Sequence, residues 1–128
     1  MSASKKSPDY LATLAAAMVM EERRRQVKKK GYSRDHDDKY TREELAAAAA
    51  FYMLPSWLDQ NVCFLDGKEG LKVSPLHRRV ADAAWKGISR DYDDPVDDLE
   101  LRITYVVRGC ALGLAELERL LRLRKGEC

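Results

Sequence analysis

The sequence predicts an all-α, four-helix bundle-like single domain with a long C-terminal helix, and a short β-hairpin or a packed irregular loop between its second and third helices. Three observations predict this class. Apolar residues recur at helical spacing, and a cap residue followed by proline recurs at Ser7–Pro8, Ser74–Pro75 and Asp94–Pro95. A length of 128 residues suffices for one core and not for two. We therefore expect residues 1–7 to form a flexible tail and residues 8–128 one domain.

The first predicted helix covers about Pro8 to Lys30, and its two halves differ in composition. Its first half carries an apolar stripe typical of the buried half of a helix, made of Leu11, Leu14, Ala15, Met18 and Val19. Its second half is cationic all round, which the helix dipole favours near a C-terminus, and Gly31 supplies the stop. We expect this second half to be a solvated helix end, with a binding patch as the alternative.

The second predicted helix follows a capping box formed by Thr41 and Glu44. It ends at Leu54, because Pro55 disfavours helical geometry in the residue before it. The run Ala46 to Ala50 predicts a surface on which another helix can approach closely.

The next segment breaks the helical pattern. Residues 62–65 and 71–73 are separated by the turn-rich sequence DGKEG, which favours a hairpin. Because a two-stranded ribbon is marginal by itself, we expect it to lie on the helices. The third predicted helix then runs from about Pro75 to Lys86.

The fourth predicted helix, from Val96 to about Arg124, is long for a chain of this size. About 30 residues span roughly 45 Å, whereas a compact chain of this length is only about 36 Å across. Either the helix kinks near Gly109 and Gly113, or another subunit covers it. Its surplus of apolar residues leads us to predict a homo-oligomer formed through helix 95–124.

Composition excludes several classes of partner and compartment. A formal net charge of +2 is too small to indicate a nucleic-acid partner. The apolar run of residues 11–20 is too short to span a bilayer, so we expect no membrane association. The cysteines are three in number and widely spaced, which is neither a disulfide framework nor zinc spacing, and we expect a cytoplasmic protein.

The loop before the second helix is the densest in groups that can bind a ligand. Aromatic faces stack on bases, guanidinium groups bind phosphates, and carboxylates accept from ribose hydroxyls. On this basis the candidate ligand-binding residues are Tyr32, Arg34, His36, Asp37, Asp38, Tyr40, Trp57, Trp85 and Lys86. The alternative is structural, with Asp37 and Asp38 tying the loop to neighbouring helix ends.

A metal-dependent enzyme is the competing hypothesis. His36, Asp37 and Asp38 would have to meet the acids of residues 93–100 to make an oxygen-rich magnesium site, as in all-α nucleotide pyrophosphatases of the MazG kind. Those enzymes place paired acids on two facing helices, and this chain offers only Asp97 and Glu100 at that spacing. We therefore expect no catalytic residues, no metal and no cofactor.

Two segments resemble small proteins encoded by phages and prophages. Residues 22–52 are similar to the signature E-R-x-R-Q…G-[WY]-[ST]-x-x-H-D-D-x-[YH]-[TA]-x-x-E-L-x-x-A-A-x-x-Y, and residues 106–120 resemble the closing helix of the same family. Trp85–Lys86 matches its W-K pair, whereas its W-P-W run is reduced here to Trp57. The resemblance implies a phage accessory protein acting in the bacterial host cytoplasm.

These observations lead to one functional hypothesis and two alternatives. We expect a phage-encoded counter-defence protein that binds and sequesters a nucleotide-derived immune signalling molecule without cleaving it. The first alternative is a MazG-like metal-dependent nucleotide hydrolase. The second is a protein that inhibits a host defence protein by direct contact.

Overall fold

The computed structural model describes residues 8–29, 37–40, 43–55, 58, 60–67, 70–88 and 99–126. These residues form, in chain order, α1 (Pro8–Lys29), α3 (Glu44–Met53), β1 (Asn61–Asp66), β2 (Gly70–Pro75), α4 (Leu76–Ala84) and α5 (Leu99–Arg124). The structure is thus mostly helical, which is compatible with the predicted bundle-like fold, and it includes one two-stranded antiparallel sheet. Among the described helices, none is long and apolar enough to cross a membrane.

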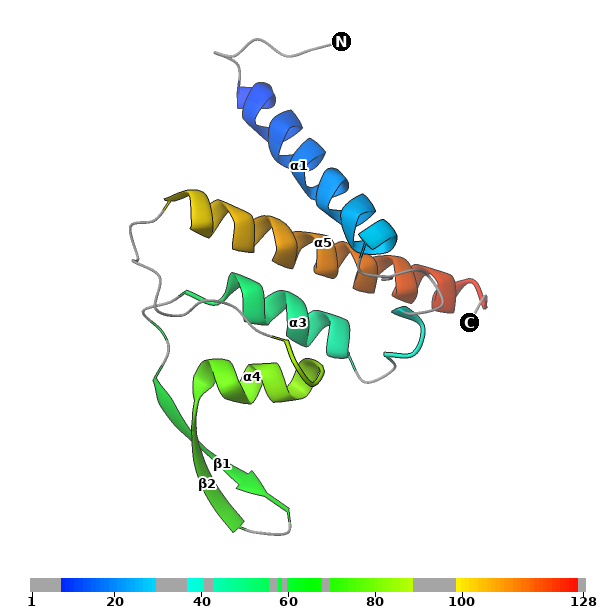
Figure 1. The fold of residues 1–128 in the computed structure, drawn as a ribbon. Helices are drawn as coiled ribbons and strands as arrows, with labels where there is room; N and C mark the ends of the chain where they lie inside the picture. The colour runs from blue at the N-terminus through cyan, green and yellow to red at the C-terminus, as the bar shows by residue number, and fades with distance from the viewer. Residues whose placement is uncertain are drawn as a thin grey trace.

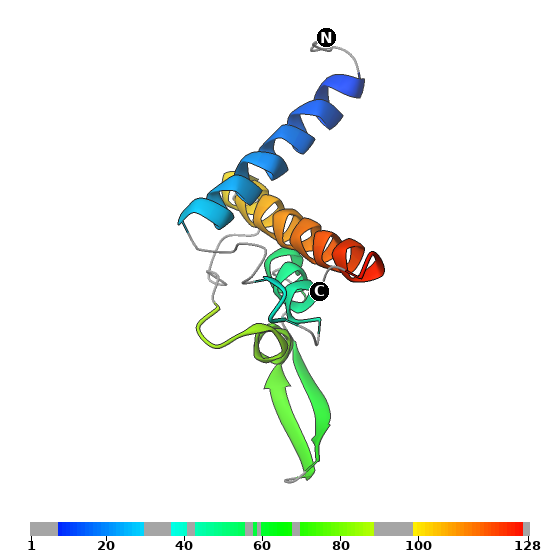
Figure 2. The same ribbon diagram turned by 90° about the vertical axis from the view of Figure 1, so that its right-hand side faces the viewer.

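The helices pack in a row rather than around one central axis. α5 lies between α1 and α3, and α3 lies between α5 and α4 (Figure 1). A quarter turn of the view shows α1 diverging from α5, so the two helices contact over only part of their lengths (Figure 2). The hairpin extends from the opposite end of the row.

The core lies mainly between α3 and α5. Leu45 and Ala48 of α3 are fully buried and form one cluster with Leu112 and Ala115 of α5. The predicted close helix contact along the alanine run is confirmed, because small side chains let the two backbones approach. Phe51, near the C-terminal end of α3, is also buried.

Gly109 lies where α5 and α3 are in close contact. A Cβ atom at this position would lie 2.9 Å from the carbonyl oxygen of Ala49 and would collide with the side chain of Met53. α5 is continuous through Gly109 and Gly113, so the glycines serve helix packing and do not end the helix. The middle of α5 is therefore covered within the same chain.

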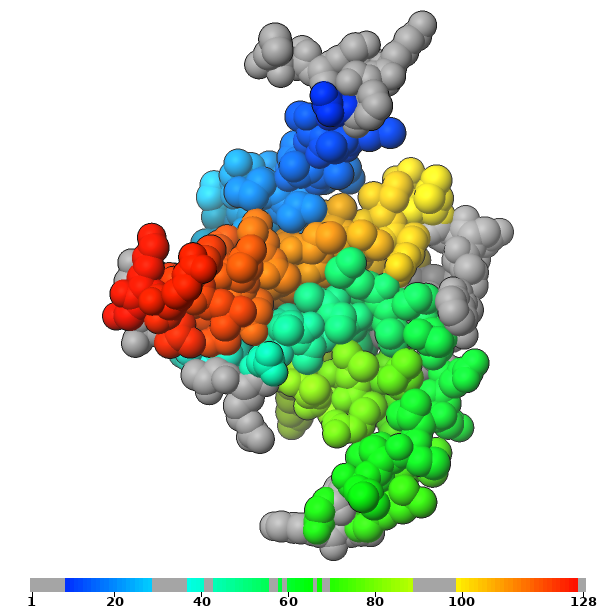
Figure 3. All heavy atoms as spheres, turned by 180° about the vertical axis from the view of Figure 1, so that it is seen from behind, coloured from blue at the N-terminus to red at the C-terminus, as the bar shows by residue number. Residues whose placement is uncertain are grey.

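The prediction for the two halves of α1 is wrong for most of the apolar stripe and for one face of the charged half. Leu11, Leu14 and Met18 are exposed, although their stripe was expected to be buried. Arg23 and Gln26 are buried, although their half was expected to be solvated, whereas Arg24 is exposed as predicted. The cause is the placement of α1: its C-terminal half crosses α5, whereas its N-terminal half extends clear of the body (Figures 1 and 3).

The start of α3 also differs from the expected capping box. The N-cap residue is Glu43, which makes no side-chain capping hydrogen bond, and Glu44 is the first helical residue instead of the third. Glu43 has φ of 66°, a left-handed conformation that non-glycine residues adopt at a free-energy cost. Thr41, the predicted cap, lies outside the described residues.

The hairpin is confirmed, with Asn61 opposite Pro75 and Asp66 opposite Gly70. It does not lie on the helices as expected, because Leu65 and Val73 are well exposed. It contacts α4 along its length instead, because the guanidinium of Arg79 in α4 lies 4.5 Å from the ring centre of Phe64, in the middle of β1.

α4 starts and ends one or two residues inside the predicted range. The backbone N–H of Leu76 donates to the carbonyl of Gln60, which joins the helix start to the base of the hairpin. At the other end Trp85 is already extended. The predicted tail of residues 1–7, the Gly31 stop and the Asp94–Pro95 cap lie outside the described residues.

Candidate functional site

A buried ion pair connects α1 to the loop that precedes α3. A guanidinium nitrogen of Arg23 donates to the Oδ2 atom of Asp37 over 2.7 Å, and Asp37 is completely buried. The same nitrogen lies 3.5 Å from a carboxylate oxygen of Glu118 in α5. Since an isolated buried carboxylate is very unfavourable, the contact with Arg23 offsets part of the free-energy cost of burying Asp37.

The next residue of the loop makes an equivalent contact with α5. Arg122 donates to the Oδ1 atom of Asp38, again over 2.7 Å, and both side chains are largely buried. Asp37 and Asp38, which are adjacent in the sequence, thus contact two different helices, α1 and α5. We call Arg23, Asp37, Asp38 and Arg122 the polar brace. This arrangement is what the structural alternative predicts, and a direct role of Asp37 and Asp38 in ligand binding stays a prediction.

Further polar side chains fill the junction of α1 and α5 beside the brace. Arg25 donates two hydrogen bonds of 2.7 Å to the carboxylate of Glu22, and Gln26 donates to the same carboxylate over 3.2 Å. Burial raises the pKa of Glu22, but the hydrogen bonds and the charge of Arg25 outweigh it, so the net pKa is below 4.5. On α5, Arg119 donates to Glu116 over 2.6 Å, with both side chains buried.

Two of the predicted ligand-binding residues meet as an aromatic pair. The rings of Tyr40 and Trp85 stack with their centres 5.3 Å apart and their planes 30° apart. A turn places Tyr40, because its N–H donates to the carbonyl of Asp37 over 3.1 Å. Burial, followed by the nearby charges of Glu44 and Asp37, raises the pKa of the Tyr40 phenol, so it is neutral at physiological pH.

Trp85 also borders a small hollow at the end of α4. The hollow has a volume of about 250 Å³, and its lining includes Trp85 and the cationic residues Arg78 and Lys86. Asp82 is the acidic residue of this lining. An aromatic ring and two cations in one lining suit a ligand that is flat and negatively charged, because the ring can stack on it and the cations can pair with its charge.

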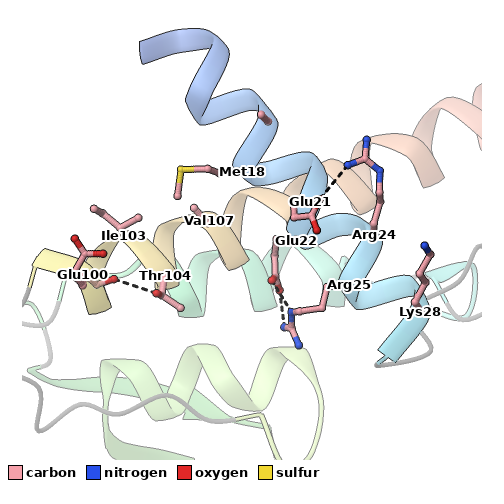
Figure 4. A pocket seen from close by; sticks show the side chains of 11 residues that line it. Met18, Glu21, Glu22, Arg24, Arg25, Lys28, Glu100, Ile103, Thr104 and Val107 are labelled. Atoms are coloured by element: carbon pink, nitrogen blue, oxygen red, sulfur yellow. Dashed lines mark hydrogen bonds and ion pairs between the residues drawn. The ribbon is translucent and has the colours of Figure 1, made fainter. Parts of the chain in front are cut away.

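A larger groove separates α1 from the first half of α5 (Figure 4). Its volume is about 830 Å³, and Met18, Ile103 and Val107 give it an apolar floor. Charges of both signs line it, namely Glu21, Glu22, Glu100, Arg24, Arg25 and Lys28. The residues that line this groove include no aromatic side chain on which a nucleotide base could stack.

The structure accounts for part of the predicted site. It joins Asp37 and Asp38 to arginines, stacks Tyr40 on Trp85 and places Lys86 beside Trp85. The remaining candidates lie outside the described residues: Tyr32, Arg34, His36 and Trp57. Within the part of the chain that is described, no three histidine, cysteine or acidic side chains gather as a metal site.

Sequence reasoning missed Arg23 and Arg122, the cationic halves of the polar brace. A signal for Arg23 was present, because Val19, Arg23 and Gln26 are spaced by four and three and so share one helix face. The same face is the less exposed side of α1. The residues on which the resemblance to phage proteins depends include Arg23, Asp37 and Asp38. In this chain, part of that motif therefore forms the internal ion pair between Arg23 and Asp37.

No family model, curated protein or solved structure matches the chain. The resemblance of residues 22–52 to phage proteins therefore stays a prediction, and the function has to be inferred from the residues themselves.

Proposed function

We propose that this protein binds a nucleotide-derived signalling molecule and sequesters it without cleaving it, as a phage-encoded counter-defence protein. The observation that carries the proposal is the stacked pair Tyr40–Trp85 with Lys86 and Arg78 at its edge. In this proposal the base of the ligand lies on Trp85 and its phosphate contacts the two cations. The phage and counter-defence parts rest on the sequence resemblance.

The hollow beside Trp85 sets the size of what it can enclose. Its volume of about 250 Å³ is just below the roughly 300–1,000 Å³ of small-molecule pockets. It therefore accommodates one moiety of a nucleotide, a base or a phosphate, with the rest of the ligand on the adjoining surface. The aromatic face and the positive charge of the hollow thus favour a ligand with a flat ring and a phosphate.

Binding is favoured over metal-dependent hydrolysis by the state of the loop acids. A hydrolase would need Asp37 and Asp38 as metal ligands, yet each already contacts an arginine at 2.7 Å. Releasing them would leave two largely buried guanidinium groups without these partners. We therefore assign Asp37 and Asp38 an indirect role: they hold the loop so that Tyr40 reaches Trp85.

Capture and release of ligands tests this proposal. The protein is incubated with a panel of cyclic nucleotides and cyclic ADP-ribose isomers, freed of excess ligand, denatured by heat and analysed by mass spectrometry. Recovery of an intact ligand supports sequestration. Recovery of a cleaved ligand indicates the nucleotide hydrolase, and failure to capture any member favours direct inhibition of a host protein.

Three variants and one control separate contact residues from the brace. We expect Trp85→Leu and Lys86→Ala to reduce capture at least tenfold, because they remove the stacking face and one charge. Lys125→Ala is the matched control, since it removes an exposed lysine elsewhere, and it should leave capture unchanged. Asp38→Asn should lower stability by about 1–3 kcal/mol while ligand is still captured. Loss of capture by the control as well would indicate non-specific charge attraction.

A further inference from the structure

The N-terminal half of α1, residues 9–20, forms an exposed apolar arm. Leu11 is 66% exposed, Leu14 43% and Met18 37%, and these three residues lie on one face of the helix. Figure 3 shows the arm standing clear of the body of the molecule. Soluble monomers rarely expose a contiguous apolar surface of this kind, so the arm is expected to be covered in the working protein.

The apolar face of the arm continues into the groove between α1 and α5. Leu11, Leu14 and Met18 are spaced by three and four residues, and Glu21, Arg25 and Lys28 continue the same spacing. Met18, Glu21, Arg25 and Lys28 all line the groove. Figure 4 shows Met18 beside Ile103 and Val107 of α5, which extend the apolar surface from one helix to the other. The arm and the groove are therefore one surface, suited to a helix.

We propose that the arm of a second copy of this chain covers this surface, antiparallel to the first arm and related to it by a two-fold axis. A two-fold interface requires one patch to be complementary to itself. The apolar arm meets that condition directly, because its leucines and methionine can pack against the same residues of the partner.

The charges on this surface favour a second copy over other occupants. Between Pro8 and Met20 the single charged residue is Asp9, so the arm has no cation with which to bind an anionic membrane or a nucleic acid. The groove carries three acids and three bases. A surface balanced in this way can match a rotated copy of itself, whereas a partner of one dominant sign would meet repulsion.

The three-and-four spacing specifies the register of the proposed pair. A two-fold axis near Ala16 places Leu14 opposite the partner's Met18. Leu11 then lies at the partner's groove, against the aliphatic part of the partner's Glu21. Each copy contributes both an arm and a groove, which extends the interface beyond the arms alone.

Light scattering measures whether the pair forms. We expect the wild-type chain at 100 μM to have twice its 14.6 kDa mass, and Leu11→Glu/Leu14→Glu to raise the dissociation constant at least about 100-fold. Circular dichroism checks folding, which exposed positions should not disturb. Leu65→Glu on the hairpin and Leu123→Glu at the end of α5 are matched controls, because both leucines are also exposed. They should leave the dimer intact.

Two results would overturn the proposal. One is a wild-type chain that is a monomer at 100 μM. The other is a dimer that survives charges in the arm but is lost in Leu123→Glu, which would move the interface to the end of α5.

Discussion

The two halves of α1 have opposite compositions and opposite environments. Leu11, in the apolar half, is 66% exposed, whereas Arg23, in the charged half, is 7% exposed. Within one chain, then, the composition of a helix segment does not determine its burial. What determines burial is whether another element lies against the segment and whether that element offers a partner for each polar group.

One face of the charged half of α1 is buried, because the polar side chains on that face have partners, whereas Arg24 and Lys28 stay exposed. Arg23 contacts Asp37, and Arg25 and Gln26 both contact Glu22. Each contact offsets the desolvation of the groups that it joins. The apolar half lies beyond the crossing with α5, where no described element covers it (Figure 2). The polar half thus contributes contacts within the single chain, and most of the apolar half is left exposed.

The largest effect that tests this comparison is expected at the polar brace. Arg23→Ala leaves Asp37 without this guanidinium in a fully buried position, so we expect the free energy of unfolding to fall by about 3–5 kcal/mol. Urea denaturation at neutral pH measures the change.

Arg24→Ala is the matched control on the next residue. Arg24 is mostly exposed and lies 3.4 Å from the exposed Glu21, so its loss should change stability by no more than about 1 kcal/mol. Equal effects of the two substitutions would contradict the importance of the brace.

The same substitution in two leucines should separate core from assembly surface. Leu45→Ala in α3 removes a fully buried side chain and should lower the free energy of unfolding by about 2–5 kcal/mol. Leu14→Ala in the arm should change it by less than about 0.5 kcal/mol at concentrations where the chain is monomeric. The measurement is chemical denaturation at high dilution. A large loss at Leu14 under these conditions would show that the arm packs within its own chain.

A smaller effect is expected where α5 meets α3. Gly109→Ala should lower the free energy of unfolding by about 1–3 kcal/mol, because its Cβ would press on the Ala49 carbonyl and the Met53 side chain. Gly113→Ala is the control, since its Cβ would lie at an ordinary 4.0 Å from Ala49. Because alanine has a higher helix propensity than glycine, Gly113→Ala should raise the free energy of unfolding slightly. Thermal unfolding of both variants checks the difference, and a stable Gly109→Ala would mean that the helices separate easily.

Local patterns in the sequence predicted most of the elements. The end of α3 was anticipated within one residue from Pro55, and the start of α4 within one residue from the Ser74–Pro75 signal. The hairpin followed from apolar runs on either side of a turn-rich segment, and the alanine run correctly indicated a close helix contact. Each of these features depends on residues near one another in the sequence.

Contacts between distant segments were not predictable in the same way. The pairing of Arg23 with Asp37 and of Arg122 with Asp38 depends on how α1 and α5 cross, which no local pattern encodes. A run of cations at a helix end has the same composition whether water or carboxylates surround it. The stack of Tyr40 on Trp85 joins residues that were predicted as ligand contacts separately, and their meeting required the fold.

The smallest expected effect is a pH dependence at Glu22. Its pKa is lowered in the folded protein, because the hydrogen bonds and charge of Arg25 outweigh the effect of burial. A carboxyl group with a lowered folded pKa stabilises the protein above its unfolded pKa, and the contribution is lost as pH falls through the folded value. The stability difference between wild type and Glu22→Gln should therefore be present at pH 7, shrink below about pH 4.5 and vanish in stronger acid.

Urea denaturation between pH 7 and pH 3 measures this difference, with Glu21→Gln as the neighbouring control. Glu21 is 82% exposed at its side chain, and surface pairs contribute little, so its variant should follow the wild type at every pH. A difference at Glu22 that stays constant with pH would assign its contribution to packing and neutral hydrogen bonds. A difference that shrinks only for Glu22 would show that the charged half of α1 is held in place by the ionised form of this buried carboxylate.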